Sequence, residues 1–188
     1  MQESSAAISA HLAPYLLAGY RRQAHITIGL CGFPMPRKQL GDDYGPACLA
    51  RQIAALEALC LEPFTLEVGA PASFTSAAYF TVHEGGGSIC RAHRALGGVG
   101  DAECPYLPHV TFGLYRERFP MAEVMAQMQL WRTKAALHFP ISRLTLMVYE
   151  AAVIGGPLSS VGEFDLGDQR WRIVDAGLME VLFGSGQG

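Results

Sequence analysis

The sequence predicts an α+β fold in which one unit of secondary structure occurs twice. Residues at about 6–83 and 88–166 each show the same expected order: a helix, a strand with a His-x-Thr motif, a second helix and two strands. Such a repeat predicts two lobes related by a pseudo-twofold axis, with the two motif strands facing each other across a cleft. The chain has 188 residues, of which 50% are hydrophobic and 16% charged, so we expect a single bilobal domain over residues 1–188.

Local signals place the elements of the first copy. An Ala- and Leu-rich stretch that stops near Gly19 predicts a helix, and Pro46 followed by apolar residues at helical spacing predicts another. The β-branched run QAHITIGL predicts the motif strand, and the prolines and glycines after it predict a loop. The expected elements are a helix at Ala6–Tyr20, a strand at Gln23–Leu30, a loop at Cys31–Gly45, a helix at Pro46–Cys60, and strands at Phe64–Gly69 and Ala77–His83.

The second copy follows a glycine break at Gly85–Gly87. Its short first helix is expected to end at Gly97 and Gly98, because glycine favours helix termination. Met and Leu on one face predict its second helix, and alternating side chains predict the strand after it. The expected elements are a helix at Ser88–Leu96, a strand at Leu107–Tyr115, a helix at Met121–Ala136, strands at Phe139–Tyr149 and Gly162–Leu166, an extra strand at Trp171–Val174, and a loose tail at Gly184–Gly188.

Each motif strand is expected to present one imidazole and one hydroxyl on the same face. Residues i and i+2 of a strand point the same way, so His25 pairs with Thr27, and His109 pairs with Thr111. The apolar residues expected on the opposite, core-facing side are Ile26, Ile28, Val110 and Phe112.

Two imidazoles and two hydroxyls suit the cleavage of a phosphodiester. A neutral imidazole takes a proton from the attacking water, and a protonated one gives a proton to the leaving oxygen. Histidine has an ordinary pKa near 6.5, so both forms exist at physiological pH. The hydroxyls of Thr27 and Thr111 can donate hydrogen bonds to the phosphate oxygens, and this chemistry requires no metal or other cofactor.

A single His-x-Thr in a strand is more often packing than function, but two are rarely a coincidence. The sequence has six histidines and seven threonines, so each histidine has a chance of 7/188, or about 4%, of a threonine two residues on. Fifteen pairs of histidines then make a double occurrence about a 2% event.

The chain resembles the two-histidine (2H) phosphoesterases, also called the 2′-5′ RNA ligase or RNA 2′,3′-cyclic phosphodiesterase superfamily. The matching motifs are His25-Ile26-Thr27-Ile28, Pro108-His109-Val110-Thr111-Phe112 and the trailing Gly32-Phe33, within a resemblance over about Ala6–Gly167. The resemblance implies antiparallel sheets lining a central cleft. It also favours His109 as the base and His25 as the acid, although the pseudo-symmetry makes either assignment possible.

The family's typical reaction opens a ribose 2′,3′-cyclic phosphate, commonly to a 2′-phosphate. Other members cleave 2′-5′ linkages, process RNA 3′ ends or only bind nucleotides. We therefore expect a metal-independent hydrolase acting on a nucleotide or RNA end, with 2′-5′ RNA ligase-like chemistry as a variant. The alternatives are a nucleotide-binding module without turnover, and a small α+β protein in which the motif strands only pack.

Three further residues are candidate substrate contacts: Arg22 just before the first motif, and Tyr115 and Arg116 just after the second. A solvated strand end explains the arginines equally simply, and packing explains the tyrosine. The four other histidines lack a threonine two residues on, and we interpret them as structural or surface residues. The five cysteines form no Cys-x-x-Cys pair, which indicates reduced thiols and no metal site.

Charge and hydropathy limit the partners. The net charge of −3 does not favour long nucleic acid, so the expected ligand is a small nucleotide or an RNA terminus. No apolar run reaches a membrane-spanning length, and the N-terminus lacks the features of a signal peptide, so we expect a cytoplasmic protein without a membrane partner. The oligomeric state is not predicted.

Overall fold

The computed structural model describes residues 2–97, 106–131 and 136–184. The helices in these ranges are α1 (Gln2–His11), α2 (Pro46–Leu59), α3 (Ser88–Ala95), α4 (Met121–Leu130) and α5 (Ala176–Phe183). The strands are β1 (Phe33–Pro34), β2 (Asp43–Tyr44), β3 (Phe64–Ser73), β4 (Ala77–His83), β5 (His109–Leu114), β6 (Leu137–Ile141), β7 (Arg143–Val148), β8 (Ser159–Asp165) and β9 (Arg170–Ile173).

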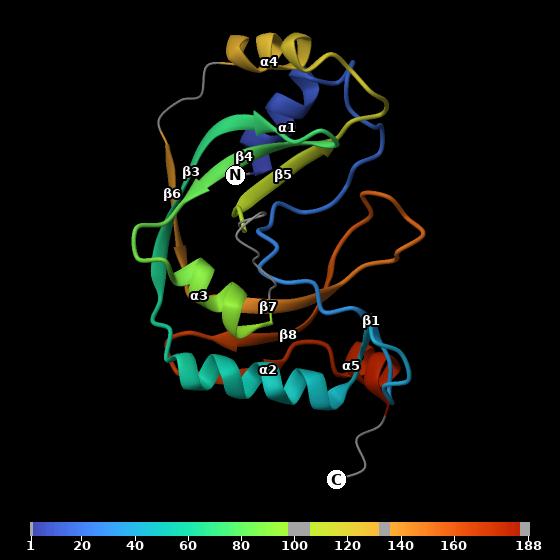
Figure 1. The fold of residues 1–188 in the computed structure, drawn as a ribbon, viewed down its shortest axis with the longest axis vertical. Helices are drawn as coiled ribbons and strands as arrows, with labels where there is room; N and C mark the ends of the chain where they lie inside the picture. The colour runs from blue at the N-terminus through green and yellow to red at the C-terminus, as the bar shows by residue number, and fades with distance from the viewer. Residues whose placement is uncertain (1, 98–105, 132–135, 185–188) are drawn as a thin grey trace.

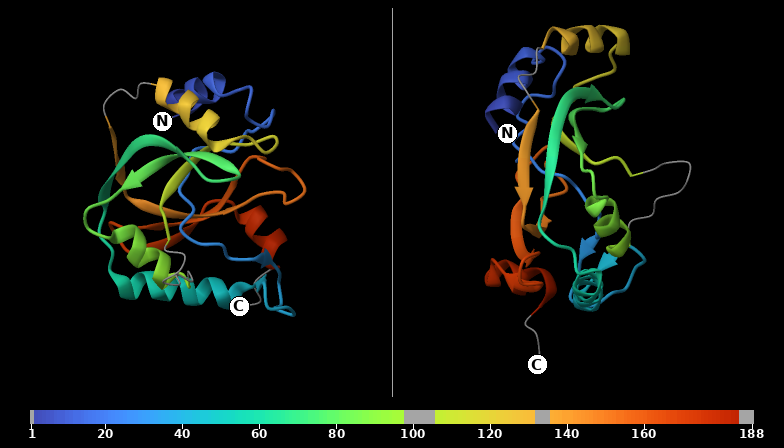
Figure 2. Two further views of the ribbon diagram at one scale, coloured as in Figure 1. Left: turned by 45° about the horizontal axis from the view of Figure 1, so that its top comes forward. Right: turned by 90° about the vertical axis from the view of Figure 1, so that its left-hand side faces the viewer.

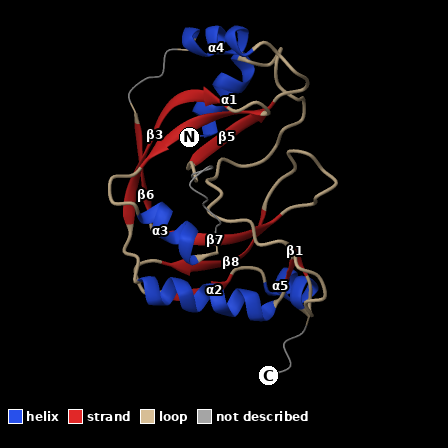
Figure 3. Ribbon diagram, in the orientation of Figure 1, coloured by secondary structure: helices blue, strands red, loops and turns tan. Residues whose placement is uncertain are grey.

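Two antiparallel sheets form the two halves of the molecule (Figure 1). The larger has the strand order β5-β4-β3-β6, and the smaller has the order β7-β8-β9. The short strands β1 and β2 form a separate parallel pair. This arrangement of helices and antiparallel sheets confirms the predicted α+β fold class (Figure 3).

Strand pairing crosses between the two sequence copies. The four-stranded sheet combines β3 and β4 of the first copy with β5 and β6 of the second. At one edge of this sheet, Phe64 of β3 pairs with Ile141 of β6. The sheet boundary therefore does not follow the boundary between the repeats.

Each sheet is covered by its own helices, as the views in Figure 2 show. Ile8 of α1 and Leu12, just after this helix, are fully buried in a cluster that also contains residues of α4 and of β3, β4 and β5. A second cluster joins Leu56 of α2 and Ala92 of α3 to β7 and β8. A third cluster packs α5 and α2 against β8. The two halves thus have separate buried clusters, and α3 contributes Ile89 to the first and Ala92 to the second.

The predicted first helix is displaced toward the N-terminus. Helix α1 ends at His11 instead of continuing to Tyr20. Pro14 explains the early end, because proline lacks an amide hydrogen and its ring collides with the carbonyl four residues earlier. The predicted helices at Pro46–Cys60 and Ser88–Leu96 are confirmed as α2 and α3.

The predicted strand at Phe139–Tyr149 is two strands in different sheets. Ile141 pairs with Phe64 in the larger sheet, whereas Arg143 pairs with Asp165 in the smaller one. The chain changes sheets at Ser142, whose carbonyl accepts a hydrogen bond of 2.8 Å from the Leu166 amide. Alternation shows which residues share a face but not which strand they pair with, so the break was not visible in the sequence.

The C-terminal part contains one helix that the sequence did not predict. Helix α5 begins after Asp175, whose carboxylate accepts a hydrogen bond of 2.8 Å from the Leu178 amide as a helix cap. The remainder of the predicted tail, residues 185–188, lies outside the described residues, as do residues 132–135 of the predicted helix at Met121–Ala136.

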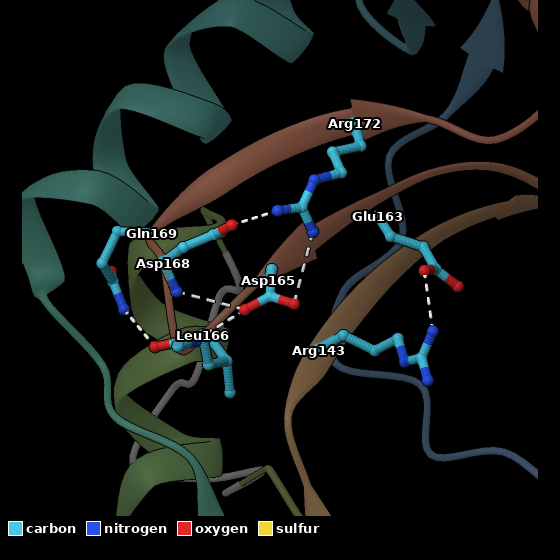
Figure 4. A network of polar contacts seen from close by, with 8 residues as sticks. Arg143, Glu163, Asp165, Leu166, Asp168, Gln169 and Arg172 are labelled. Carbon is cyan, nitrogen blue, oxygen red and sulfur yellow. Dashed lines mark hydrogen bonds and ion pairs between the residues drawn. The ribbon is translucent and has the colours of Figure 1, made fainter.

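The predicted C-terminal strands form the hairpin of β8 and β9, closed by a polar network (Figure 4). The Asp165 carboxylate accepts hydrogen bonds from the amides of Gly167 and Asp168. The Arg172 guanidinium forms ion pairs with the carboxylates of Asp165 and Asp168. These amide hydrogen bonds are the main cause of a lowered pKa at Asp165.

In the part of the chain that the structure describes, no helix is long and apolar enough to cross a bilayer.

Candidate active site

The second motif lies on β5, at one edge of the four-stranded sheet. Backbone pairing with β4 sets His109 opposite Thr81, and Thr111 opposite Tyr79. Val110 is only 4% exposed, whereas its two motif neighbours are half-buried. The predicted alternation is therefore confirmed here: the imidazole and the hydroxyl share the open face, and the apolar side chain faces the core.

The first motif is not in a strand, so the predicted strand at Gln23–Leu30 is wrong. Between Arg21 and Phe33, no backbone-to-backbone hydrogen bond joins the segment to other described residues. Ile26 packs against the core of the larger sheet, and Ile28 packs against the core of the smaller one. The β-branched pattern thus reflects an extended segment wedged between two cores, where side-chain packing replaces strand pairing.

The two imidazoles share one local arrangement. His25 Nδ1 lies 2.7 Å from the carbonyl oxygen of Gln23, and His109 Nδ1 lies 2.8 Å from that of Leu107. In both cases the partner is two residues earlier in the chain. A carbonyl oxygen only accepts, so Nδ1 carries the hydrogen in each ring. In the neutral form, Nε2 is therefore the nitrogen that accepts a proton.

Two cavities adjoin at the segment that carries the first motif. The larger has a volume of about 1320 Å³ and includes His25 and Thr27 in its lining. The smaller, of about 470 Å³, includes Thr111. Arg21, Arg22 and Ala24 line both cavities. Thr27 and Thr111 therefore line two different cavities that share three residues, and His109 is in the described lining of neither.

The imidazoles lie within reach of each other's charge. Burial is the largest effect on His25 and lowers its pKa, although the hydrogen bond with the Gln23 carbonyl acts in the opposite direction. Positive charge on Arg22 and on His109 lowers the same pKa further. Positive charge nearby thus disfavours the protonated form of His25.

Aromatic rings surround His109. The imidazole meets Phe74 edge-on at 4.9 Å between ring centroids, and Tyr79 at 5.4 Å. Phe74 and Tyr79 themselves stack at 4.1 Å. These contacts restrict the His109 ring, and they arise because Tyr79 lies on the adjacent strand, facing the same side as the motif.

Arg22 is held against the wall of the larger cavity. Its guanidinium lies 4.3 Å from the centroid of the Tyr149 ring, and its Nε donates to the Gly156 carbonyl at 3.1 Å. Because Arg22 also lowers the pKa of His25, it brings positive charge to the site.

Tyr115 and Arg116 lie at the far end of β5 and line neither of the two cavities, as far as the described residues show. The Tyr115 hydroxyl shares a hydrogen bond of 2.6 Å with Ser73, and Arg116 pairs with Glu117 at 3.3 Å. Their contact with substrate stays a prediction.

Two residues that tie the first motif to the second were missed by sequence reasoning. His93 Nδ1 lies 2.5 Å from the Ile28 carbonyl, and the Tyr106 hydroxyl donates to the Thr27 carbonyl at 2.9 Å. The sequence shows only that Tyr106 comes three residues before His109. His93 carries no local signal, since its partner lies 65 residues away.

Within the described ranges, no group of three or more His, Cys, Asp or Glu side chains is placed to hold a metal ion. The described cysteines, Cys31, Cys48, Cys60 and Cys90, are free thiols.

Comparison with known families assigns the chain to a superfamily. Residues 3–152 match the family model of the 2′-5′ RNA ligase superfamily, which is the two-histidine phosphoesterase superfamily. The match covers 150 of the 188 residues (152 − 3 + 1) and contains both motifs, so the chain belongs to this superfamily. Membership supports an activity of the phosphoesterase or ligase type. A search of curated proteins found no match.

Proposed function

We propose that this chain is a metal-independent phosphodiesterase that hydrolyses a 2′,3′-cyclic phosphate, or a 2′-5′ linkage, of a nucleotide or RNA end. The observation that carries the proposal is the pair of similarly arranged imidazoles. Both His25 and His109 bond through Nδ1 to the carbonyl two residues earlier, and the charge on one changes the pKa of the other. A phosphodiester between two such rings meets a base and an acid together.

Hydrolysis of the cyclic phosphate then proceeds by in-line attack. The neutral Nε2 of one imidazole removes a proton from water as the water oxygen bonds to phosphorus. The bond from phosphorus to one ribose oxygen breaks, and that oxygen takes a proton from Nε2 of the other imidazole. The product is a ribose phosphate monoester, and exchange of protons with solvent restores the starting state of the pair.

The threonine hydroxyls stabilise the charge that builds on the phosphate. Thr27 and Thr111 come from the two motifs and border the two neighbouring cavities. Hydrogen bonds to the non-bridging oxygens strengthen as negative charge develops in the transition state. Arg22 adds positive charge near the same place, held in position by Tyr149 and the Gly156 carbonyl.

The direction of the pKa shift at His25 supports one of the two possible assignments of acid and base. Burial and the nearby Arg22 lower its pKa, which favours the neutral imidazole in the resting protein. A neutral ring serves as the base, so this direction supports His25 as the base and His109 as the acid. That is the reverse of the assignment implied by the family resemblance.

The test is turnover of nucleoside 2′,3′-cyclic monophosphates in the presence of a chelator, followed by phosphorus NMR to identify the product isomer. We expect conversion to one monoester, undiminished by the chelator, and no conversion of a 3′,5′-cyclic nucleotide. Loss of activity in the chelator with recovery on adding a divalent ion would contradict the metal-independent mechanism. Binding of the nucleotide without turnover would instead support the nucleotide-binding module.

A further inference from the structure

The segment that carries the first motif lacks, among the described residues, the strand pairing that holds β5 in place. A catalytic group must be held close to its productive geometry, and strand pairing does this for His109. No backbone pairing with the described residues holds His25 and Thr27. Their alignment must therefore come from side-chain packing and side-chain hydrogen bonds, some of which reach the segment from elsewhere.

Two aromatic side chains bond to consecutive carbonyls of this segment. The Tyr106 hydroxyl donates to the Thr27 carbonyl at 2.9 Å, and His93 Nδ1 lies 2.5 Å from the Ile28 carbonyl. Because a carbonyl only accepts, His93 Nδ1 is the donor. We call His93 and Tyr106 the carbonyl clamp.

The two rings of the carbonyl clamp also hold each other. Their centroids are 4.0 Å apart, and their planes differ by 9°, so they stack face to face. Each donor is therefore restricted by the neighbouring ring as well as by its own hydrogen bond. Burial raises the pKa of Tyr106 to about 12, which keeps its hydroxyl protonated, as a donor, through the physiological range.

The clamp connects the two motifs through a short path. Tyr106 precedes His109 by three residues, and it bonds to Thr27, the hydroxyl-bearing residue of the first motif. His93 anchors the next residue from α3, a helix packed against the smaller sheet. One path thus joins the chain leading into β5, the segment of the first motif and the second core.

We propose that His93 and Tyr106 are positioning residues of the active site, which align the first motif with the second by clamping the Thr27 and Ile28 carbonyls. The inference rests on the proposed phosphodiesterase function. Neither residue needs to touch the substrate. Their removal should therefore lower kcat with little change in KM.

The test uses variants that remove one hydrogen-bond donor of the carbonyl clamp and keep an aromatic ring at that position. Tyr106→Phe and His93→Phe should each lower kcat by about 5- to 50-fold with KM within about threefold, since misplacing a catalytic group by about 1 Å costs up to about 100-fold. His93→Asn places an amide N–H where Nδ1 lies and should recover most of the loss. Matched controls are Tyr15→Phe, which loses a hydroxyl bond to Glu123, and His83→Phe at an exposed position.

A second readout does not depend on turnover. NMR titration of His25 should show its pKa moving up toward 6.5 in Tyr106→Phe and His93→Phe, because a loosened segment is less buried. An inactive wild-type protein would refute the proposed function, and the titration alone would then judge the clamp. Folded Tyr106→Phe and His93→Phe proteins with wild-type kcat and an unchanged His25 titration would overturn the clamp.

Discussion

The second motif lies in a strand with β4 beside it, whereas the first lies in a segment without strand partners among the described residues. Both nevertheless bond Nδ1 of the histidine to the carbonyl two residues earlier. The orientation of each ring is therefore a local property of the motif. The position of each motif is a long-range property: sheet register sets it for His109, and packing with side-chain hydrogen bonds sets it for His25.

The comparison predicts that the two motifs differ in how they tolerate changes around them, but not in how they tolerate loss of the histidine itself. A strand that loses one side-chain contact keeps its backbone ladder. The segment of the first motif is held by a few side-chain contacts, so removing any one of them removes a large share of what fixes its position.

The largest effect is expected from removal of either imidazole. His25→Ala and His109→Ala should each lower kcat by about 10²–10⁴-fold, which is the usual contribution of a positioned acid or base. The double variant should lose far less than the product of the two losses, because both groups act in one transition state. Steady-state kinetics on a nucleoside 2′,3′-cyclic phosphate measures this, with His138→Ala, an exposed histidine of β6, as the control. Full activity in a folded His109→Ala protein would refute the mechanism.

The same variants assign the two roles. A p-nitrophenyl phosphodiester has a leaving group that needs no protonation, so loss of the acid should matter little with it. We expect His109→Ala to recover activity on this substrate and His25→Ala to stay impaired. The opposite result would assign His109 as the base, as the resemblance implies.

A smaller effect is expected at the threonines. Thr27→Val and Thr111→Val each remove one hydrogen bond to a charged phosphate, a loss of about 1–3 kcal/mol. This corresponds to about a 5- to 150-fold lower kcat/KM. Thr65→Val on β3, at an exposed position, is the matched control. Equal losses at the two positions would show that both motifs contribute equally despite their different supports; no loss at Thr111 would remove the second hydroxyl from the mechanism.

The pH dependence should show the lowered pKa of His25. The rate is expected to follow a bell, with the acid limb below pH 6.5, because the more acidic imidazole of the pair sets that limb in either role assignment.

The lowered pKa of His25 also affects the pH dependence of stability. The unfolded chain, with an ordinary pKa near 6.5, binds the proton first, so the stabilisation is full above that pH and is lost as the pH falls through the folded-state pKa. Rate profiles combined with NMR titration of His25 measure both, and an acid limb above pH 6.5 would contradict the direction of the shift.

The smallest effects are expected from removing one hydrogen-bonding side chain near each motif. Gln23 exchanges two hydrogen bonds with the Leu158 backbone, of 3.0 and 2.8 Å, and Thr81 donates one of 3.2 Å to the Ala70 carbonyl. Gln23→Ala should lower kcat about threefold, within the roughly 0.5–1.5 kcal/mol of an ordinary hydrogen bond. Thr81→Val should leave kcat unchanged, because the backbone ladder still holds β5. Equal kinetic effects of the two substitutions would remove the distinction between the motifs.

Local patterns were sufficient for much of the fold. Pro46 and apolar spacing predicted α2, and alternation predicted that Val110 faces the core, where it is only 4% exposed. The repetition of His-x-Thr was sufficient to nominate both histidines and to indicate the superfamily. These features depend on neighbours within a few positions, so the sequence carries them directly.

Tertiary structure decided the features that depend on distant partners. Alternation in Phe139–Tyr149 did not reveal the change of sheets at Ser142, because pairing with β3 or β8 leaves the pattern the same. The isoleucines of the first motif predicted a strand, but each packs against a different core. The carbonyl clamp joins residues 65 and 79 positions apart, and a hydrogen bond over such a separation forms only after the chain has folded. By itself, the sequence therefore determined which groups we propose for the chemistry, and the tertiary structure decided what holds them in place.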